Sequence, residues 1–250
     1  YWVIYGLTAG VGQFGCLFYA MHIGMPAGVA SVVMQSQAVF TIALAALFLR
    51  EPISRRQLLG LAVAALGLYL VSGGPAGGAP AAVPPAALLL TIASAAWWGV
   101  SNIVVRLATA RAAALGLNLD MLGVTIWSSL VPPLPLLGLS LALDGRDAVI
   151  RAAVQADLTS AFAVAFLAYG ATLFGFGMWN RLLARYPTGR IAPMSLLVPV
   201  TGILTAALVL DERLTWLQGL GCALVVAGLA LTTLAPAAPA RAAAGSARPR

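Results

Sequence analysis

Long runs of apolar residues alternate with short polar turns along the whole chain. Each run is about 20 residues long, which lets a helix cross a bilayer core of roughly 30 Å. The runs are continuous and lack an alternation of period two, so they predict helices rather than the strands of a barrel. Eight blocks follow from this pattern: 1–22, 27–49, 56–73, 86–108, 119–143, 158–183, 190–210 and 215–234. The pattern therefore predicts an all-α integral membrane protein.

The end of the chain repeats its beginning at a fixed offset. Residues 13–72, moved forward by 161 positions, fall on residues 174–233 without a gap. The matched pairs include Pro26 with Pro187, Gly28 with Gly189, Glu51 with Glu212, Gln57 with Gln218, Gly60 with Gly221 and Gly67 with Gly228. Identities that persist through turns as well as apolar runs indicate a duplicated unit. Duplication inside a membrane protein is typical of transporters built from two related halves.

The repeat pairs the first block with the sixth, five crossings later. An odd number of crossings inverts the second copy, so we expect two inverted repeats related by a pseudo-twofold axis in the membrane plane. Three blocks in the first half and five in the second predict that the first two of ten helices are missing here. The expected organisation is a first repeat at 1–72 (its last three helices), a Gly/Pro linker at 73–85, a second repeat of five helices at 86–234 and a disordered basic tail at 235–250.

Composition and charge agree with a membrane protein. The chain is 61% hydrophobic and 8% charged, whereas soluble domains carry about a quarter charged residues. A net charge of +7 suggests nucleic acid in a soluble protein, but the arginines here lie at block ends and report topology. Successive loops face opposite sides of the membrane. The loops of one side hold eleven of the fourteen arginines, and the loops of the other side hold three. The positive-inside rule assigns the larger group to the cytoplasm, together with the C-terminus, and no nucleic-acid partner is expected.

Polar turns and small residues predict local features. The pairs Ser54 with Gln57 and Thr215 with Gln218 form capping boxes. Glu51 and Glu212 precede these helix starts and are expected to complement the positive end of the helix dipole. The segment 144–157 predicts a short interfacial helix, and prolines at 132, 133 and 135 predict a bend. The spacing of Gly60 and Gly67, and of their repeat partners, predicts close helix contact.

The apolar blocks offer no Ser/His/Asp set, carboxylate pair or metal triad from which a catalytic centre could be assembled. All seven acidic residues lie at block ends or in loops, no lysine occurs, and His22 is the single histidine. The sequence therefore offers no mid-membrane carboxylate for a proton relay, no lysine for a P-loop and no histidine cluster for a metal site. Cys16 and Cys222 are interpreted as small packing residues inside blocks. We predict no catalytic residues, no metal and no cofactor.

Amide and aromatic side chains are the candidates for binding. An amide that faced lipid would leave donors and acceptors unsatisfied, so these groups must face protein or water. The candidate residues are Gln13, Tyr19, Gln35, Gln37, Trp98, Asn102 and Trp179. Such a set suits a small polar or zwitterionic metabolite. The alternative is that these groups only join helices, an interaction typically worth under about 1 kcal/mol.

Two long segments, at 5–42 and 185–221, resemble a known family. They look like the O-acetylserine/cysteine exporter branch of the EamA transporters, in the drug/metabolite transporter superfamily, and the resemblance extends over 1–234. It implies an exporter of the bacterial inner membrane with a central cavity between the halves. The W-x-x-x-N pattern of that family falls on Trp98 and Asn102, its polar-helix amides fall on Gln35 and Gln37, and Gln13 matches the glutamine of the preceding helix. Arg106 stands where relatives often have lysine.

These observations predict a secondary transporter that exports small metabolites by alternating access, with amino acids such as cysteine or O-acetylserine as first candidates. A broader exporter of drugs or aromatic amino acids is an alternative, since Trp98, Trp127 and Trp179 offer stacking surfaces. A membrane-embedded enzyme is a further alternative, for which the sequence offers no nucleophile, acid or metal site. The expected partners are a small polar metabolite and the lipid bilayer, and a homodimer is compatible with this picture.

Overall fold

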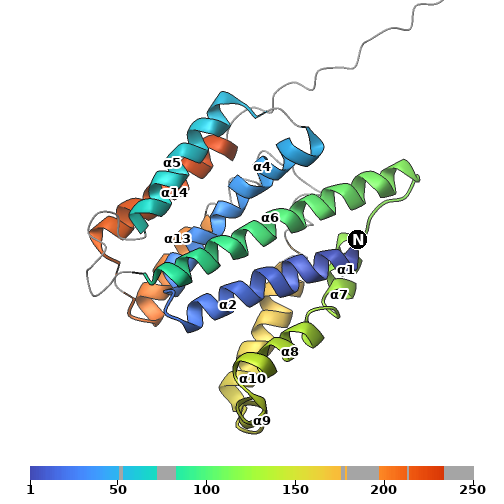
Figure 1. Ribbon diagram of the computed structural model, residues 1–250, viewed down its shortest axis with the longest axis vertical. Coiled ribbons are helices and arrows are strands. Elements are labelled where there is room, and N and C mark those ends of the chain that lie inside the picture. Colours follow the sequence, from blue (N-terminus) through green and yellow to red (C-terminus); the bar gives the residue numbers. More distant parts are fainter. Residues whose placement is uncertain (51–52, 72–82, 176–177, 179–196, 213, 234–250) are drawn as a thin grey trace, which may run out of the picture.

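The computed structural model is an assembly of helices (Figure 1) and describes residues 1–50, 53–71, 83–175, 178, 197–212 and 214–233. Among these residues, four helices are long and apolar enough to cross a membrane: Trp2–His22, Ala27–Leu49, Pro85–Ala114 and Met121–Leu143. Arg146–Val154 and Leu158–Phe174 form a further candidate that is bent by 94°. Each of these spans overlaps a predicted block, so the helical membrane prediction is confirmed for the described part.

The element bounds divide most spans into shorter pieces. The first half contains α1 (Trp2–Tyr5), the π-helical η1 (Gly6–Gln13), α2 (Phe14–His22), α3 (Ala27–Val33), the 3₁₀ turn η2 (Met34–Ser36), α4 (Gln37–Leu49) and α5 (Arg55–Val71). The second half contains α6 (Pro85–Ala114), α7 (Met121–Ser128), α8 (Pro133–Leu143), α9 (Arg146–Val154), α10 (Leu158–Ala165), the π-helical η4 (Phe166–Phe174), α13 (Leu197–Val209) and α14 (Trp216–Thr233). Glu51, Trp179, most of the predicted linker and the C-terminal tail lie outside the described residues.

Local sequence signals explain several of these boundaries. Both predicted capping boxes are present: the Ser54 N–H donates to Gln57 Oε1 at 2.8 Å, and the Gln57 N–H donates to Ser54 Oγ at 3.2 Å. The Thr215 and Gln218 box has the same two bonds, at 3.0 and 3.2 Å. The helix is interrupted where the prolines predict a bend, because α7 ends at Ser128 and α8 begins at Pro133.

The polar segment at 144–157 contains the predicted short helix, α9. Asp157 follows it and caps α10, accepting hydrogen bonds from the Ser160 hydroxyl at 2.7 Å and the Ser160 N–H at 2.8 Å. These bonds stabilise the ionised carboxylate and lower the pKa of Asp157 below its usual range. Both partners of this cap lie within the second half of the chain.

Helix α6 occupies the middle of the assembly, between the span that contains α2 and the span that contains α4 (Figure 1). Glycines allow the close approach on both sides. A Cβ atom on Gly99 would lie 2.7 Å from Phe40 Cβ, and one on Gly12 would lie 2.7 Å from the Trp97 ring. The apolar core gathers buried side chains from α3, α6 and α14, including Val29, Val33, Ala87, Val225 and Leu229.

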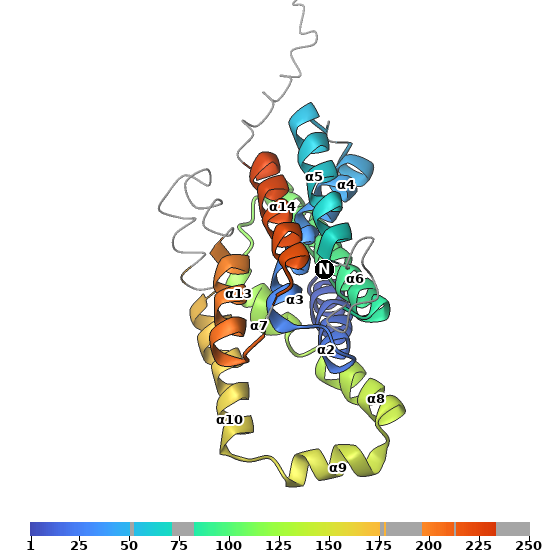
Figure 2. The ribbon, with the colours of Figure 1, turned by 90° about the vertical axis from the view of Figure 1, so that its left-hand side faces the viewer.

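Helices α5 and α14 lie side by side (Figures 1 and 2). Among the described helices, they form the most extensive contact between the two halves. Gly60 packs on Gly228 and Gly67 packs on Gly221, so the two helices run antiparallel. A Cβ atom on Gly60 would lie 2.5 Å from the Gly228 carbonyl oxygen, and one on Gly67 would lie 2.6 Å from the Gly221 carbonyl oxygen. The predicted role of these glycines in close helix contact is confirmed.

A second contact between the halves joins α13 to α3. The carboxylate of Glu212, three residues after α13, accepts hydrogen bonds from the N–H groups of Ala27 at 2.7 Å and Gly28 at 2.8 Å. The sequence predicts that Glu212 complements the helix that starts just after it. The structure corrects that prediction, because the two bonds go to the first turn of α3, which lies far away in the sequence.

Candidate functional site

Two of the predicted binding residues meet in a hydrogen-bonded cluster between α4 and α6. Asn102 Nδ2 donates to Gln37 Oε1 at 2.8 Å and to Thr41 Oγ1 at 3.0 Å. The Thr41 hydroxyl in turn donates to the Gln37 carbonyl oxygen at 2.8 Å. All three side chains are half-buried. The cluster therefore presents amide and hydroxyl groups inside membrane-length helices, where a polar solute would need such partners.

The backbone is irregular just before this cluster. The helix from Ala27 to Leu49 changes to a 3₁₀ turn at Met34–Ser36, and Gln37 follows directly. The turn carries Gln35, which is half-buried, and Ser36, which is 1% exposed. The Ser36 hydroxyl has no hydrogen-bond partner among the residues that the structure describes. Short 3₁₀ pieces inside a helix often mark functional hinges.

Gln13, at the end of η1, contacts the central helix α6 at another level. Its carbonyl oxygen accepts a hydrogen bond from the Ser94 hydroxyl at 2.7 Å, and its side chain is 5% exposed. Ser94 precedes Asn102 by eight residues, which corresponds to about 12 Å along a helix. Gln13 also ends the π-helical stretch η1, a feature found frequently at functional sites. Two of the predicted binding residues, Gln13 and Gln37, are thus hydrogen-bonded to α6 at different levels, Gln13 through its backbone carbonyl and Gln37 through its side chain.

The other candidates are placed less closely. Trp98 is half-buried on α6, one turn before Asn102, and its carbonyl oxygen accepts from the Ser101 hydroxyl at 2.7 Å. Tyr19 is 41% exposed, and its ring lies 6.1 Å from that of His22 at the end of α2. Trp179 lies outside the described residues. Among the predicted binding residues, Gln37 and Asn102 are thus joined by a side-chain hydrogen bond. Tyr19 lies near the end of α2.

Sequence reasoning did not rank Ser36 and Thr41 among the binding candidates. Both belong to the run QSQAVFT, in which polar residues at 35, 36, 37 and 41 interrupt an apolar block. Residues 37 and 41 are four apart and therefore share one helix face. That spacing is the signal that would have joined Thr41 to Gln37.

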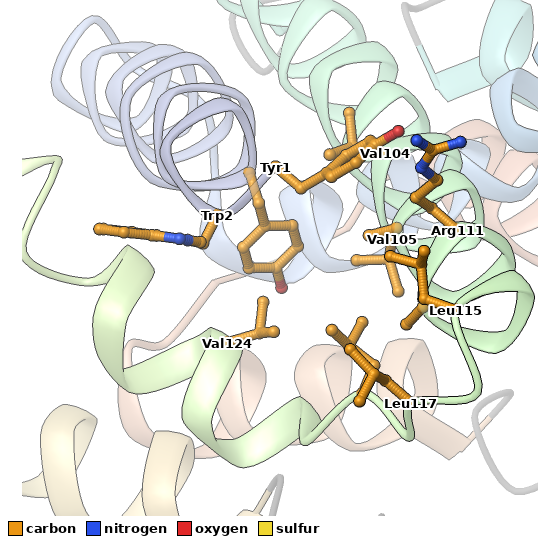
Figure 3. Close-up of a pocket in the computed structure, with 12 residues that line it drawn as sticks. Tyr1, Trp2, Val104, Val105, Arg111, Leu115, Leu117 and Val124 are labelled. Carbon is orange, nitrogen blue, oxygen red and sulfur yellow. The ribbon is translucent and has the colours of Figure 1, made fainter.

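The structure also contains an apolar pocket of about 320 Å³ at the start of α1 and the end of α6 (Figure 3). Tyr1 and Trp2 line it from α1, Val105 and Arg111 from α6, and Val124 from α7. None of the six predicted binding residues that the structure describes lines this pocket. Its walls offer few partners for a zwitterion, so it does not replace the amide cluster as the candidate site. Among the described residues, no group of three or more His, Cys, Asp or Glu side chains is placed to hold a metal ion.

Comparison with known proteins identifies the family. The EamA-like transporter family matches residues 1–73 and 85–234. The chain belongs to this family. No solved structure matches it.

Several named relatives align with most of the chain. A "probable amino-acid metabolite efflux pump" of Escherichia coli K12 is 42% identical over 225 residues, which cover 90% of this chain and 73% of that protein. The protein with the same description in Salmonella typhimurium LT2 is 41% identical over 90% of this chain and 73% of its own length. A "probable terminal-alkyne amino-acid exporter" of Streptantibioticus cattleyicolor is 26% identical over 90% of this chain and 70% of its own length. These names describe transporters rather than enzymes.

Proposed function

We propose that this EamA-family protein is a secondary transporter that exports small metabolites, with amino acids of the cysteine pathway as the first candidates. Family membership and the relatives' descriptions as amino-acid efflux pumps and exporters support this function. The structural observation that carries it is the cluster of Gln37, Thr41 and Asn102 between two membrane-length helices. Amides and hydroxyls bind the carboxylate and ammonium groups of a zwitterion without a fixed charge of their own.

We further propose that the two halves are inverted repeats of a ten-helix fold. The glycine contacts support this layout: a shift of 161 residues turns the pair Gly60 and Gly228 into the pair Gly221 and Gly67, and both pairs are in contact. A twofold relation requires this reciprocity. Alternating access would then move one half against the other, and the amide cluster would face each side in turn.

Export of labelled amino acids tests the function directly. The protein would be produced in cells loaded with labelled cysteine, O-acetylserine or a neutral control sugar. We expect faster loss of one or both amino acids than in cells without the protein, and no change for the sugar. Equal loss of all three compounds would contradict the proposal. Preferential loss of an aromatic amino acid or a drug would favour the broader exporter, for which Trp98, one turn before Asn102, is a candidate stacking residue.

We propose that the protein lies in the bacterial inner membrane, with the turn before α5 and the C-terminus in the cytoplasm. Arg55→Cys, in a background with Cys16 and Cys222 replaced by alanine, should resist a membrane-impermeant maleimide added to the outside of intact cells. Arg151→Cys is the matched control, because Arg151 is also exposed but belongs to the arginine-poor group of loops. We expect labelling of Arg151→Cys alone. Labelling of Arg55→Cys from outside would overturn this topology.

A further inference from the structure

The first turn of α3 has no cap of its own. The helix begins after Pro26, a residue whose side chain makes no capping hydrogen bond. The first backbone N–H groups of any helix lack partners within the helix and need acceptors from elsewhere. For Ala27 and Gly28, the acceptors are the two carboxylate oxygens of Glu212, at 2.7 and 2.8 Å. A carboxylate in this place is also favoured by the positive end of the helix dipole.

The bonds to Glu212 close one end of a tight contact between α3 and α13. A Cβ atom on Gly28 would lie 3.0 Å from Ala206 Cβ and 3.1 Å from Glu212 Oε2. Further along the same two helices, Gly202 leaves room for the Ser31 side chain. Ala206 is 3% exposed beneath α3. Separation of the two helices would therefore expose Ala206 and release Glu212 together.

The α5 and α14 contact and the α3 and α13 contact differ in kind. In the α5 and α14 contact, the two backbones touch at two pairs of glycines. Separating these helices would leave gaps at the glycines that no side chain could fill, and the van der Waals contacts there would be lost. The α3 and α13 contact ends in a half-buried carboxylate and two N–H groups near the ends of their helices. Water can replace these hydrogen bonds at modest net cost once the contact opens. Of these two contacts, the one between α3 and α13 is better suited to repeated opening.

We propose that Glu212 and the first turn of α3 form a latch that holds the two halves together at one end and opens during each transport cycle. The proposal rests on the proposed export function and adds a residue that controls access to the site. By the distribution of arginines, this end lies on the non-cytoplasmic side. Glu212 is therefore a positioning residue, which acts through the separation of α3 from α13 and not through contact with the solute.

The test follows the exposure of Ala206 in the membrane-embedded protein. Ala206→Cys serves as the reporter, in a background with Cys16 and Cys222 replaced by alanine, and its rate of labelling by a small maleimide is measured with and without Glu212→Ala. Loss of a helix cap corresponds to a change of about 2- to 30-fold in an opening equilibrium. We expect labelling to accelerate by that factor, and Glu212→Gln, which keeps one carbonyl acceptor, to lie between.

The matched control is Asp157→Ala, which removes a carboxylate cap whose bonds stay within one half. It should leave the labelling of Ala206→Cys unchanged. Unchanged labelling in Glu212→Ala, or equal acceleration in Asp157→Ala, would overturn the latch. If Glu212→Ala fails to reach the membrane, the Glu212→Gln measurement decides in the same way. An unaltered protein that exports nothing would instead contradict the proposed function, because the labelling readout does not depend on transport.

Discussion

Replacing Gly228 by alanine should push α14 away from α5 and lower the thermal stability of the protein in detergent. The new Cβ atom would lie 2.5 Å from the Gly60 carbonyl oxygen and 2.6 Å from the Ala64 backbone nitrogen. Both neighbours are backbone atoms, so no side-chain rotation relieves the overlap and the helices themselves must move. Overpacking of this kind typically costs about 1–3 kcal/mol. The loss of stability is measured as a lower melting temperature. Unfolding is followed by the fluorescence of a thiol-reactive dye, or by the loss of the monodisperse peak in size-exclusion chromatography after heating.

Gly219→Ala is the control, because Gly219 lies on the same helix and a Cβ atom there would meet nothing within 4 Å. Alanine favours a helix over glycine by about 1 kcal/mol, so this substitution should leave the stability unchanged or raise it slightly. The two substitutions add the same methyl group to one helix and differ only in what that group meets. Equal stability of the two variants would show that the backbones of α5 and α14 are not in direct contact.

The parts of the fold that depend on neighbouring residues could be predicted from the sequence. The helix starts at Ser54 and Thr215 follow from boxes in which both partners lie within four residues, and both boxes have the expected bonds. The break before Pro133 follows in the same way, because proline lacks the N–H that a continuous helix would use. Such features need no knowledge of the tertiary structure.

The partners of long-range contacts could not be predicted in this way. Glu212 lies 185 positions from Ala27, and its sequence neighbourhood points to the dipole of the following helix. The need for a remote acceptor arises at Pro26, whose side chain cannot cap, and only the packing of α13 on α3 brings the carboxylate there. The repeat did indicate which glycines share a face, but their pairing across the halves depends on the relative position of the two helices.

The candidate site shows the same division. Depth along the apolar blocks brought Gln13, Gln37 and Asn102 together as candidates, and the structure places all of them along α6. The bond between Gln37 and Asn102, and the role of Thr41, depend on the rotation of α4 against α6, which Gly99 permits. Ser36, whose hydroxyl has no hydrogen-bond partner in the described part of the chain, lies in a 3₁₀ turn that apolar periodicity does not reveal.

Replacing Gln37 by leucine should reduce export steeply while the protein still reaches the membrane. Leucine keeps the bulk of the side chain and removes both functions of the amide. Asn102 retains its bond to Thr41 Oγ1 at 3.0 Å, so the donor that served Gln37 is not left without any partner. A solute that has shed water between the helices loses a hydrogen-bond partner worth about 1–3 kcal/mol, or roughly 5- to 150-fold in affinity.

The measurement is the initial rate of amino-acid export at several internal concentrations, corrected for the amount of protein in the membrane. Gln155→Leu is the control, since it makes the same substitution at an exposed amide after α9 and should leave the rate unchanged. If Gln37→Leu alone loses export while its amount in the membrane stays normal, the Gln37 amide takes part in binding the solute. Full export by a Gln37→Leu protein would show that Gln37 and Asn102 only join α4 to α6, since an interhelical hydrogen bond contributes stability without touching the solute.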